Sequence, residues 1–342
     1  MDIKVLFNNL KVYNKKYKID KKDIKIKKVK STNIESGPFI SNKIYDYIKD
    51  NLKYEHFCYF DYKNIRINLK LYYKKRNNDI LVLVNKIITR IIFMMNITNT
   101  YKDVYLEIYD TPFKKELPCF NEDVCGKKLN CENVNTGYSW SNNIVIYRSE
   151  ELLKLIIHEI IHLLDIDIKY EEANLFKKFA DMFCVSKINL LINESYVETW
   201  AIILDIYLKL WEMNELNYDK FDYYLKKTRL FNLGQCAKIC IYYNIYKYED
   251  LFKEKRKCLK NLNDTSNVFS YHILKLVNLY NLDEFILNNS VNKKQIITKK
   301  YNYKKYLKYL LVGFPKIKEG LNVKIKKKKN KKYGLSLKMS LI

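Results

Sequence analysis

Histidine, glycine and proline are scarce in this chain, whose 342 residues include only four histidines, seven glycines and four prolines. No long polar low-complexity tract is present, and 48% of the residues are hydrophobic, which argues against a disordered protein. None of the eight cysteines forms a Cys-x-x-Cys pair, so we expect reduced and partly buried thiols. The length suits one large domain or two ordinary ones.

Long apolar runs are also missing. The run from Val5 to Phe7 is followed by Asn8 and Asn9, and it is too short for the core of a signal peptide. The most apolar stretch, residues 80–97, is interrupted by polar and charged side chains and therefore predicts a buried helix, not a membrane span. We expect an intracellular protein with no transmembrane segment.

Acidic residues are outnumbered in this chain. It contains 63 lysines and arginines against 38 acidic residues, for a net charge of +25, and the lysines concentrate in residues 15–30 and 326–332. Lysine clusters of this kind bind nucleic acid or nucleoprotein in many proteins. They also keep a lysine-rich protein soluble, and the sequence leaves both explanations open.

Half of the histidines lie in one pentapeptide, His158-Glu159-Ile160-Ile161-His162. Positions four apart lie on one face of an α-helix, so His158 and His162 can direct ring nitrogens at a single metal ion. Glu159 then projects beside the open position of the metal, where a carboxylate can take a proton from water that zinc has acidified to a pKa of about 7. This H-E-x-x-H pattern predicts one catalytic Zn²⁺ ion.

The residues around the pentapeptide predict a buried helix, because apolar side chains cover most of its circumference. Buried imidazole and carboxylate groups need partners, since an unpaired polar group costs about 2–7 kcal/mol in apolar surroundings. The alternative interpretation is that one stripe of side chains is only the polar edge of an amphipathic helix. That stripe consists of Lys154, His158, His162 and Asp165.

Periodicity predicts an α/β half followed by a helical half. In the first half we expect helices over residues 41–52 and 79–95, a hairpin of strands 57–62 and 65–73, and strands over 24–29, 104–109 and 144–147. In the second half we expect helices over residues 170–185, from about 187 or 193 to 213, and over 218–228, 233–246 and 271–278.

The expected fold class is therefore α+β, mainly α, with a small mixed sheet. We divide the chain into a basic arm (1–35), an α/β part (36–167), a helical part that supplies the third metal ligand (168–315) and a basic tail (316–342). The short strand Ile144, Val145, Ile146 and Tyr147 directly precedes the histidine helix. We expect it at the edge of the sheet, where a peptide substrate can add as an extended chain.

A catalytic zinc ion usually has three protein ligands, so the two histidines are not enough. The residues after His162 lack the Gly and His of the metzincin pattern. Glu194 and Glu198 lie four apart on a predicted helix, and Glu194 follows His162 by 32 residues. Glu194 is the candidate ligand, and Glu198 would accept a hydrogen bond from the other ring nitrogen of His158. Whether Glu198 takes the place of Glu194 as the ligand stays open. Asp165 is a further candidate for either role.

With these motifs the chain resembles the gluzincin metallopeptidases, whose zinc ligands are His, His and Glu. Together with the runs Asn135 to Trp140 and Ile144 to Arg148, the motifs are also similar to zinc metallopeptidases encoded by large DNA viruses of the poxvirus or giant-virus type. The resemblance covers roughly residues 104–205 and implies a zincin-like fold. For a viral protein, the expected location is the host cytoplasm or the virion.

The resemblance also implies roles for individual residues. His158, His162 and Glu194 would bind zinc, and Glu159 would act as general base and then as proton donor to the leaving amine. An oxyanion stabiliser is expected as well, for which Tyr271 and His272 are the candidates.

We therefore expect a zinc metallopeptidase, a hydrolase that cleaves proteins or peptides as an endopeptidase. The competing hypothesis is a basic nucleic-acid-binding or scaffold protein with a structural or vestigial metal site. A peptidase brought to nucleoprotein by its lysine-rich ends would combine the two.

Overall fold

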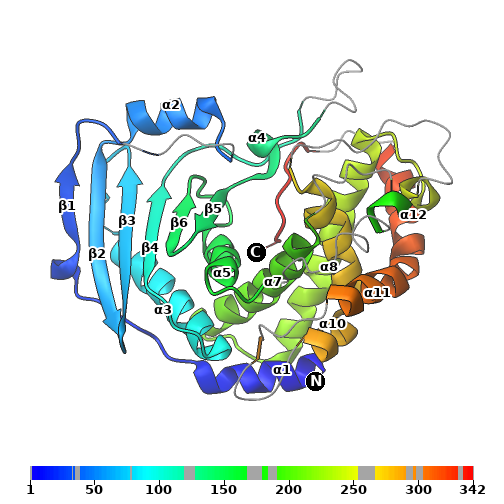
Figure 1. Cartoon of the computed structure of the whole chain (residues 1–342), viewed down its shortest axis with the longest axis horizontal. Helices are drawn as coiled ribbons and strands as arrows, with labels where there is room; N and C mark the ends of the chain where they lie inside the picture. The colour runs from blue at the N-terminus through cyan, green and yellow to red at the C-terminus, as the bar shows by residue number, and fades with distance from the viewer. Residues whose placement is uncertain are drawn as a thin grey trace.

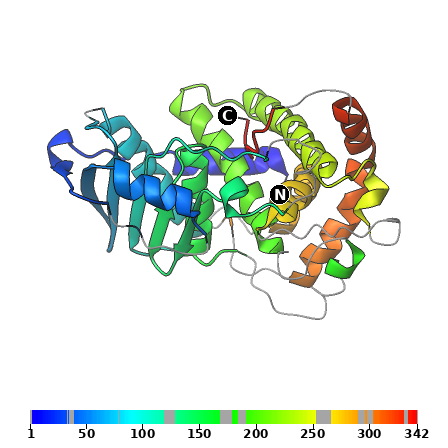
Figure 2. The same cartoon turned by 90° about the horizontal axis from the view of Figure 1, so that it is seen from above.

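The computed structural model confirms the α+β, mainly α fold class (Figure 1). A mixed sheet lies on one side of the molecule and a group of helices on the other, as the view from above also shows (Figure 2). The structure describes residues 2–32, 34, 39–77, 79–118, 128–167, 179–183, 191–252, 266–289, 296–297, 303–329 and 334–341.

The sheet has six strands in the order β1-β2-β3-β4-β6-β5. The first three strands are antiparallel neighbours, β3, β4 and β6 run parallel, and β5 runs antiparallel to β6. The predicted hairpin is confirmed, because β2 and β3 pair from Tyr54 opposite Tyr73 to Tyr62 opposite Ile65. The strands are β1 (Lys25–Lys28), β2 (Tyr54–Tyr62), β3 (Ile65–Tyr73), β4 (Val104–Tyr109), β5 (Gly137–Trp140) and β6 (Asn143–Ile146).

Helices cover both faces of this sheet. On the outer face, Ile44 and Ile48 of α2 pack on Tyr72, Tyr109 and Val145. The inner face joins the main hydrophobic core, which includes the apolar sides of α3 and α5. The helical elements of this half are α1 (Ile3–Leu10), η1 (Lys11–Tyr13), η2 (Lys21–Asp23), α2 (Asn42–Asn51), α3 (Leu81–Thr98), α4 (Cys131–Val134) and α5 (Leu152–Leu163).

Helix α3 is long and apolar enough to cross a membrane by length and composition alone, and it is the only such helix among the described residues. However, 67% of this helix is buried inside the protein, where it contacts α5. Arg90 in its middle is fully buried and is paired with Glu212 and Asp205. The prediction of a buried core helix over this stretch is confirmed.

The second half is helical, as predicted. Helix α8 joins the two helices expected over 218–228 and 233–246, because no helix-breaking residue separates them, and it ends at Tyr242, four residues before the expected end. Most of the helix expected over 170–185 lies outside the described residues. The elements are α7 (Ile192–Glu212), α8 (Tyr218–Tyr242), η4 (Tyr248–Leu251), the π-helical turn η6 (Ser270–Leu274), α9 (Lys275–Tyr280), α10 (Leu282–Asn289), α11 (Tyr303–Gly313), η7 (Phe314–Ile317) and α12 (Lys318–Lys329).

Both end segments, expected as a basic arm and a basic tail, pack on the rest of the chain. Helix α1 lies against the helical half, where Phe7 contacts the rings of Tyr207, Tyr218 and Phe221 (Figure 1). Near the other end, Leu337 is fully buried and residues 334–341 run back between the two halves. Both segments carry apolar residues beside the lysine clusters, so the net charge of the chain ends does not predict that they are buried.

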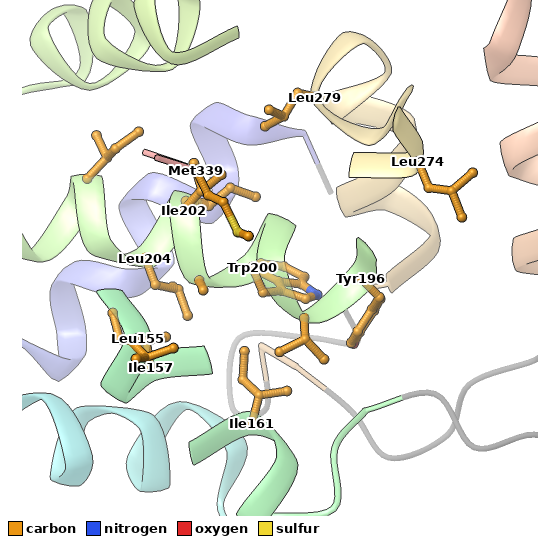
Figure 3. Close-up of a cluster of buried hydrophobic side chains, with 14 of the residues drawn as sticks. Leu155, Ile157, Ile161, Tyr196, Trp200, Ile202, Leu204, Leu274, Leu279 and Met339 are labelled. Carbon is orange, nitrogen blue, oxygen red and sulfur yellow. The ribbon is translucent and has the colours of Figure 1, made fainter. Parts of the chain in front are cut away.

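Helices α5 and α7 pack against each other in the middle of the molecule (Figure 1). Figure 3 shows Leu155, Ile157 and Ile161 of α5 facing Trp200 and its neighbours on α7. Trp200 is fully buried. Burial of a large aromatic side chain contributes several kcal/mol of stability, so this contact fixes the position of the two helices that carry the candidate metal ligands.

Candidate metal centre

The side chains of His158, His162 and Glu194 converge between α5 and α7. The Nε2 atoms of the two histidines are 3.3 Å apart. Glu194 Oε2 lies 3.3 Å from Nε2 of His158 and 3.6 Å from Nε2 of His162. The three side chains thus form a group that can hold one metal ion.

The spacing of these atoms fits zinc. Bonds of about 2.0–2.1 Å at tetrahedral angles separate two ligand atoms by about 3.3–3.4 Å, which is close to the distances within this triangle. Glu194 Oε2 is buried and accepts no well-formed hydrogen bond from the described residues. Two imidazole nitrogens and one carboxylate oxygen are the ligand set of many catalytic zinc sites.

Besides Glu194, each imidazole contacts another carboxylate through its Nδ1 atom. Nδ1 of His158 lies 3.0 Å from Glu198 Oε2, which is the predicted contact, and Nδ1 of His162 lies 3.0 Å from Asp167 Oδ2. Asn193 donates a hydrogen bond to the same Asp167 oxygen, at 3.4 Å. A carboxylate at Nδ1 places the proton there and leaves the Nε2 lone pair for the metal.

Asp165, a candidate for this role, lies elsewhere. Its carboxylate pairs with Lys102 at 2.6 Å and is 47% exposed. Helix α5 ends at Leu163, and Asp165 adopts a left-handed turn with φ of 53°, so it leaves the face that carries the histidines. Asp167 takes the position instead, and the sequence holds no signal for it beyond the presence of an acid near the end of the helix.

Behind Glu198 lies a buried network of charges. Lys154 donates a hydrogen bond to Glu198, and its Nζ is 3.7 Å from Glu151. Lys275 lies 3.8 Å from Glu198, and Lys115 pairs with Glu151. The side chains of all five residues are at most 3% exposed. The alternative interpretation of a solvated polar edge is therefore wrong for Lys154, which is buried.

Burial and pairing shift the pKa values of the buried network in opposite directions. Burial alone would lower the pKa of Lys154, but Glu151 and Glu198 outweigh it and raise that pKa. Burial lowers the pKa of Lys275 to about 7. Burial opposes ionisation of Glu198, yet Lys154 and His158 hold its pKa well below the usual range. Of the two lysines, Lys154 is therefore the one that stays protonated beside Glu198 at neutral pH.

Burial and pairing also shift the pKa values of the two histidines in opposite directions. Burial disfavours the charged form of both rings, but the neighbouring carboxylates outweigh it and raise both pKa values. The pKa of His162 lies well above its ordinary value because of Glu194 and Asp167. The pKa of Glu194 lies well below its ordinary range, since His162 and His158 outweigh the cost of its burial. In the metal-free protein, protons and a metal ion would therefore compete for the same ring nitrogens.

A cavity of about 220 Å³ opens onto this cluster. Glu159 lines it beside the three candidate ligands, as the H-E-x-x-H pattern predicts for a general base. Tyr271 lines it too, and the centre of its ring is 6.2 Å from that of His158. His272 is fully buried and does not line the cavity, because successive residues of a helical turn point in different directions. Of the two oxyanion candidates, only Tyr271 lies at the site.

The strand nearest the cavity is β5, not β6. Strand β6, which contains Ile144, Val145 and Ile146, is hydrogen-bonded to β4 on one side and β5 on the other, and Tyr147 follows it and bonds to Thr136. The edge position predicted for residues 144–147 is therefore wrong. Strand β5 pairs with β6 alone within the described part of the chain, and Gly137, Tyr138 and Ser139 line the cavity.

The last described segment closes the cavity at the start of α5. Met339 lines the cavity, and its backbone N–H donates to Glu151 at 3.1 Å. The N–H and hydroxyl groups of Ser340 donate to the same carboxylate. Glu151 thus joins the C-terminal segment to the charge network, a contact between residues too distant in sequence to be predicted from spacing.

No family model matches the chain, and neither curated proteins nor solved structures give a significant match.

Proposed function

We propose that this chain is a zinc-dependent peptidase. The observation that carries the proposal is the triangle of His158 Nε2, His162 Nε2 and Glu194 Oε2, with sides of 3.3, 3.3 and 3.6 Å, in one cavity with Glu159. A zinc ion held by these atoms supplies a Lewis acid that polarises a carbonyl group and lowers the pKa of water to about 7.

The residues of the chain supply the remaining roles. The carboxylate of Glu159 takes the proton of the attacking water and then gives it to the leaving nitrogen. The Tyr271 hydroxyl donates a hydrogen bond to the oxygen of the attacked carbonyl. Burial raises the pKa of Tyr271 well above its usual value, so the phenol keeps the proton that it has to donate.

Strand β5 offers a peptide its backbone hydrogen bonds. Tyr147 N–H donates to Thr136 O at 3.0 Å, so Thr136, Tyr138 and Trp140 direct their backbone groups at β6. The N–H and C=O groups of the alternate residues, Gly137 and Ser139, then point away from β6. A side chain at Gly137 would clash with the Val145 carbonyl oxygen, since a Cβ atom would lie 2.6 Å from it. An extended substrate can therefore add to β5 beside Glu159.

Metal analysis and peptide hydrolysis of the full chain test the proposal. We expect about one zinc ion per chain, loss of hydrolysis of a mixed peptide library on chelation, and recovery when zinc is restored. His162→Ala should lose both zinc and activity. A wild-type protein that binds zinc and hydrolyses no peptide would instead support the competing hypothesis of a structural or vestigial site in a nucleic-acid-binding or scaffold protein.

A further inference from the structure

Three aromatic side chains form a stack along β5, on the face of the sheet that α2 partly covers. The rings of Phe39 and Tyr138 are 5.5 Å apart and inclined by 28°, and those of Tyr138 and Trp140 are 5.4 Å apart and inclined by 24°. Phe39 and Trp140 are 50% and 43% exposed. We call these three residues the aromatic stack.

The aromatic stack borders the candidate active site. Phe39 and Tyr138 line the catalytic cavity. Trp140 lines an adjoining hollow, which shares His162 and Ser139 with that cavity. Exposed aromatic side chains that border a binding site commonly supply its contact surface. The stack therefore lies where a peptide on β5 would pass.

Backbone geometry decides which substrate side chains would meet the stack. A peptide bonded to Gly137 and Ser139 places two of its own residues directly opposite Tyr138 and Trp140. Those residues form the non-hydrogen-bonded pairs of an antiparallel ladder, in which Cα atoms are only about 4.5 Å apart and side chains approach most closely. Residues two apart on a strand share a face, so both side chains would lie on the stack.

We infer that this protein selects extended peptides with large apolar side chains at two positions two residues apart, held by Tyr138 and Trp140. The inference rests on the proposed function and names its substrate class. The residue between these two positions points to the opposite face, toward α5 and the cavity. The adjoining hollow is otherwise lined mainly by polar side chains, of which Lys102 and Asp165 pair with each other at 2.6 Å, so the Trp140 ring supplies most of the apolar contact there.

The test compares two labelled peptides of identical composition, one containing Phe-Ser-Phe and the other Phe-Phe-Ser in the same flanking sequence. Binding is measured with zinc-loaded Glu159→Gln protein, which keeps the site but cannot turn over substrate. We expect the alternating peptide to bind about two- to fivefold tighter, because it forms one more aromatic cross-strand pair than the other peptide.

Two variants in the same background locate the effect. Trp140→Ala should bring the ratio of the two affinities close to one. Tyr59→Ala is the matched control: Tyr59 is 48% exposed on the same face of the sheet, but it lies on β2, four strands from β5. This control should leave the ratio unchanged.

The outcomes separate this inference from the proposed function. Equal binding of the two peptides, or a ratio that survives Trp140→Ala, overturns the aromatic stack as the selecting surface, even if wild-type protein hydrolyses both peptides. In the other case, the alternating peptide binds more tightly and Trp140→Ala removes this preference, but the wild-type protein hydrolyses neither peptide. That result supports the binding surface and overturns the proposed peptidase.

Discussion

Each candidate zinc-binding imidazole makes two contacts that together fix its orientation. In His158, Nδ1 contacts Glu198 while Nε2 faces Glu194; in His162, Nδ1 contacts Asp167 while Nε2 faces the same Glu194 oxygen. A ring held in this way cannot rotate to present the wrong nitrogen. The candidate metal site is therefore preorganised by residues that are not themselves candidate ligands.

Glu198→Gln should weaken zinc binding about 10–100-fold, because the amide is a poorer acceptor for the His158 Nδ1 proton and no longer balances Lys154. Competition with a chelator of known affinity measures the effect. Glu215→Gln, at a partly exposed acid that pairs with Lys220, is the control and should bind zinc normally. Equal affinities of both variants would contradict the role of Glu198.

Zinc affinity should also depend on pH. Protons and zinc compete for Nε2 of His158 and His162, and the pKa values of both rings lie above the ordinary 6.5 in the metal-free protein. Affinity should therefore fall as the pH drops through these raised values, by about tenfold per pH unit for each proton displaced, and level off above them. Chelator competition across a pH series measures the slope. A flat profile below pH 6.5 would contradict protonation of the two rings.

Spacing along a helix predicted which four residues meet at one cavity, and their roles stay predictions. His158, Glu159 and His162 lie as the H-E-x-x-H pattern requires, and Glu194 meets them from α7. Asp165 was misplaced because counting along one face assumes that the helix continues, whereas α5 ends two residues earlier. The contact of Asp167 depends on the turn that follows, which no periodic pattern describes.

Between elements, the buried charges that join α5 to α7 have no access to water, so removal of one partner leaves another unbalanced. Lys154→Met keeps the length of the side chain but leaves Glu198 without its principal cation. We expect a loss of about 3–5 kcal/mol in the free energy of unfolding, measured by urea denaturation. Lys226→Met breaks the exposed pair with Asp222 on α8 and should cost less than about 0.5 kcal/mol. Similar losses in the two variants would contradict the account.

Periodicity predicts strands at the positions of β1, β2, β3, β4 and β6 but none at β5, and it predicts the wrong strand at the edge of the sheet. Residues 144–147 form a continuous apolar run, which is typical of a strand buried on both faces and so favours an interior position, where the structure has β6. Strand β5 reads Gly-Tyr-Ser-Trp, four residues without a clear alternation of buried and exposed positions. Its place at the edge follows from pairing with β6, a contact that the sequence of β5 alone does not specify.

Across the whole molecule, the C-terminal segment 334–341 connects the two halves. Leu337 N–H donates to Lys115 O and Leu117 N–H donates to Leu335 O, both at 2.8 Å, while Gln235 of α8 donates to Lys338 O at 2.7 Å. The segment thus bonds to the loop beside the sheet and to the helical half. Its contacts span more than a hundred residues of sequence, and local composition gives only the charge of such a segment.

Leu337→Ala should lower the free energy of unfolding by about 2–5 kcal/mol, since Leu337 is fully buried. Leu341→Ala, at a residue of the same segment that is 41% exposed, is the matched control and should cost much less. Thermal or urea unfolding measures both. A negligible effect at Leu337 would show that the segment is peripheral to the fold.

The central claim is that Glu159 acts as general base beside a zinc ion held by His158, His162 and Glu194. The most direct measurement is the rate of peptide hydrolysis by Glu159→Gln against wild type, with zinc content determined on the same samples. We predict equal zinc content and a loss of at least about 100-fold in kcat/KM, the lower range for removal of a general base. Equal hydrolysis by the two proteins would contradict the claim.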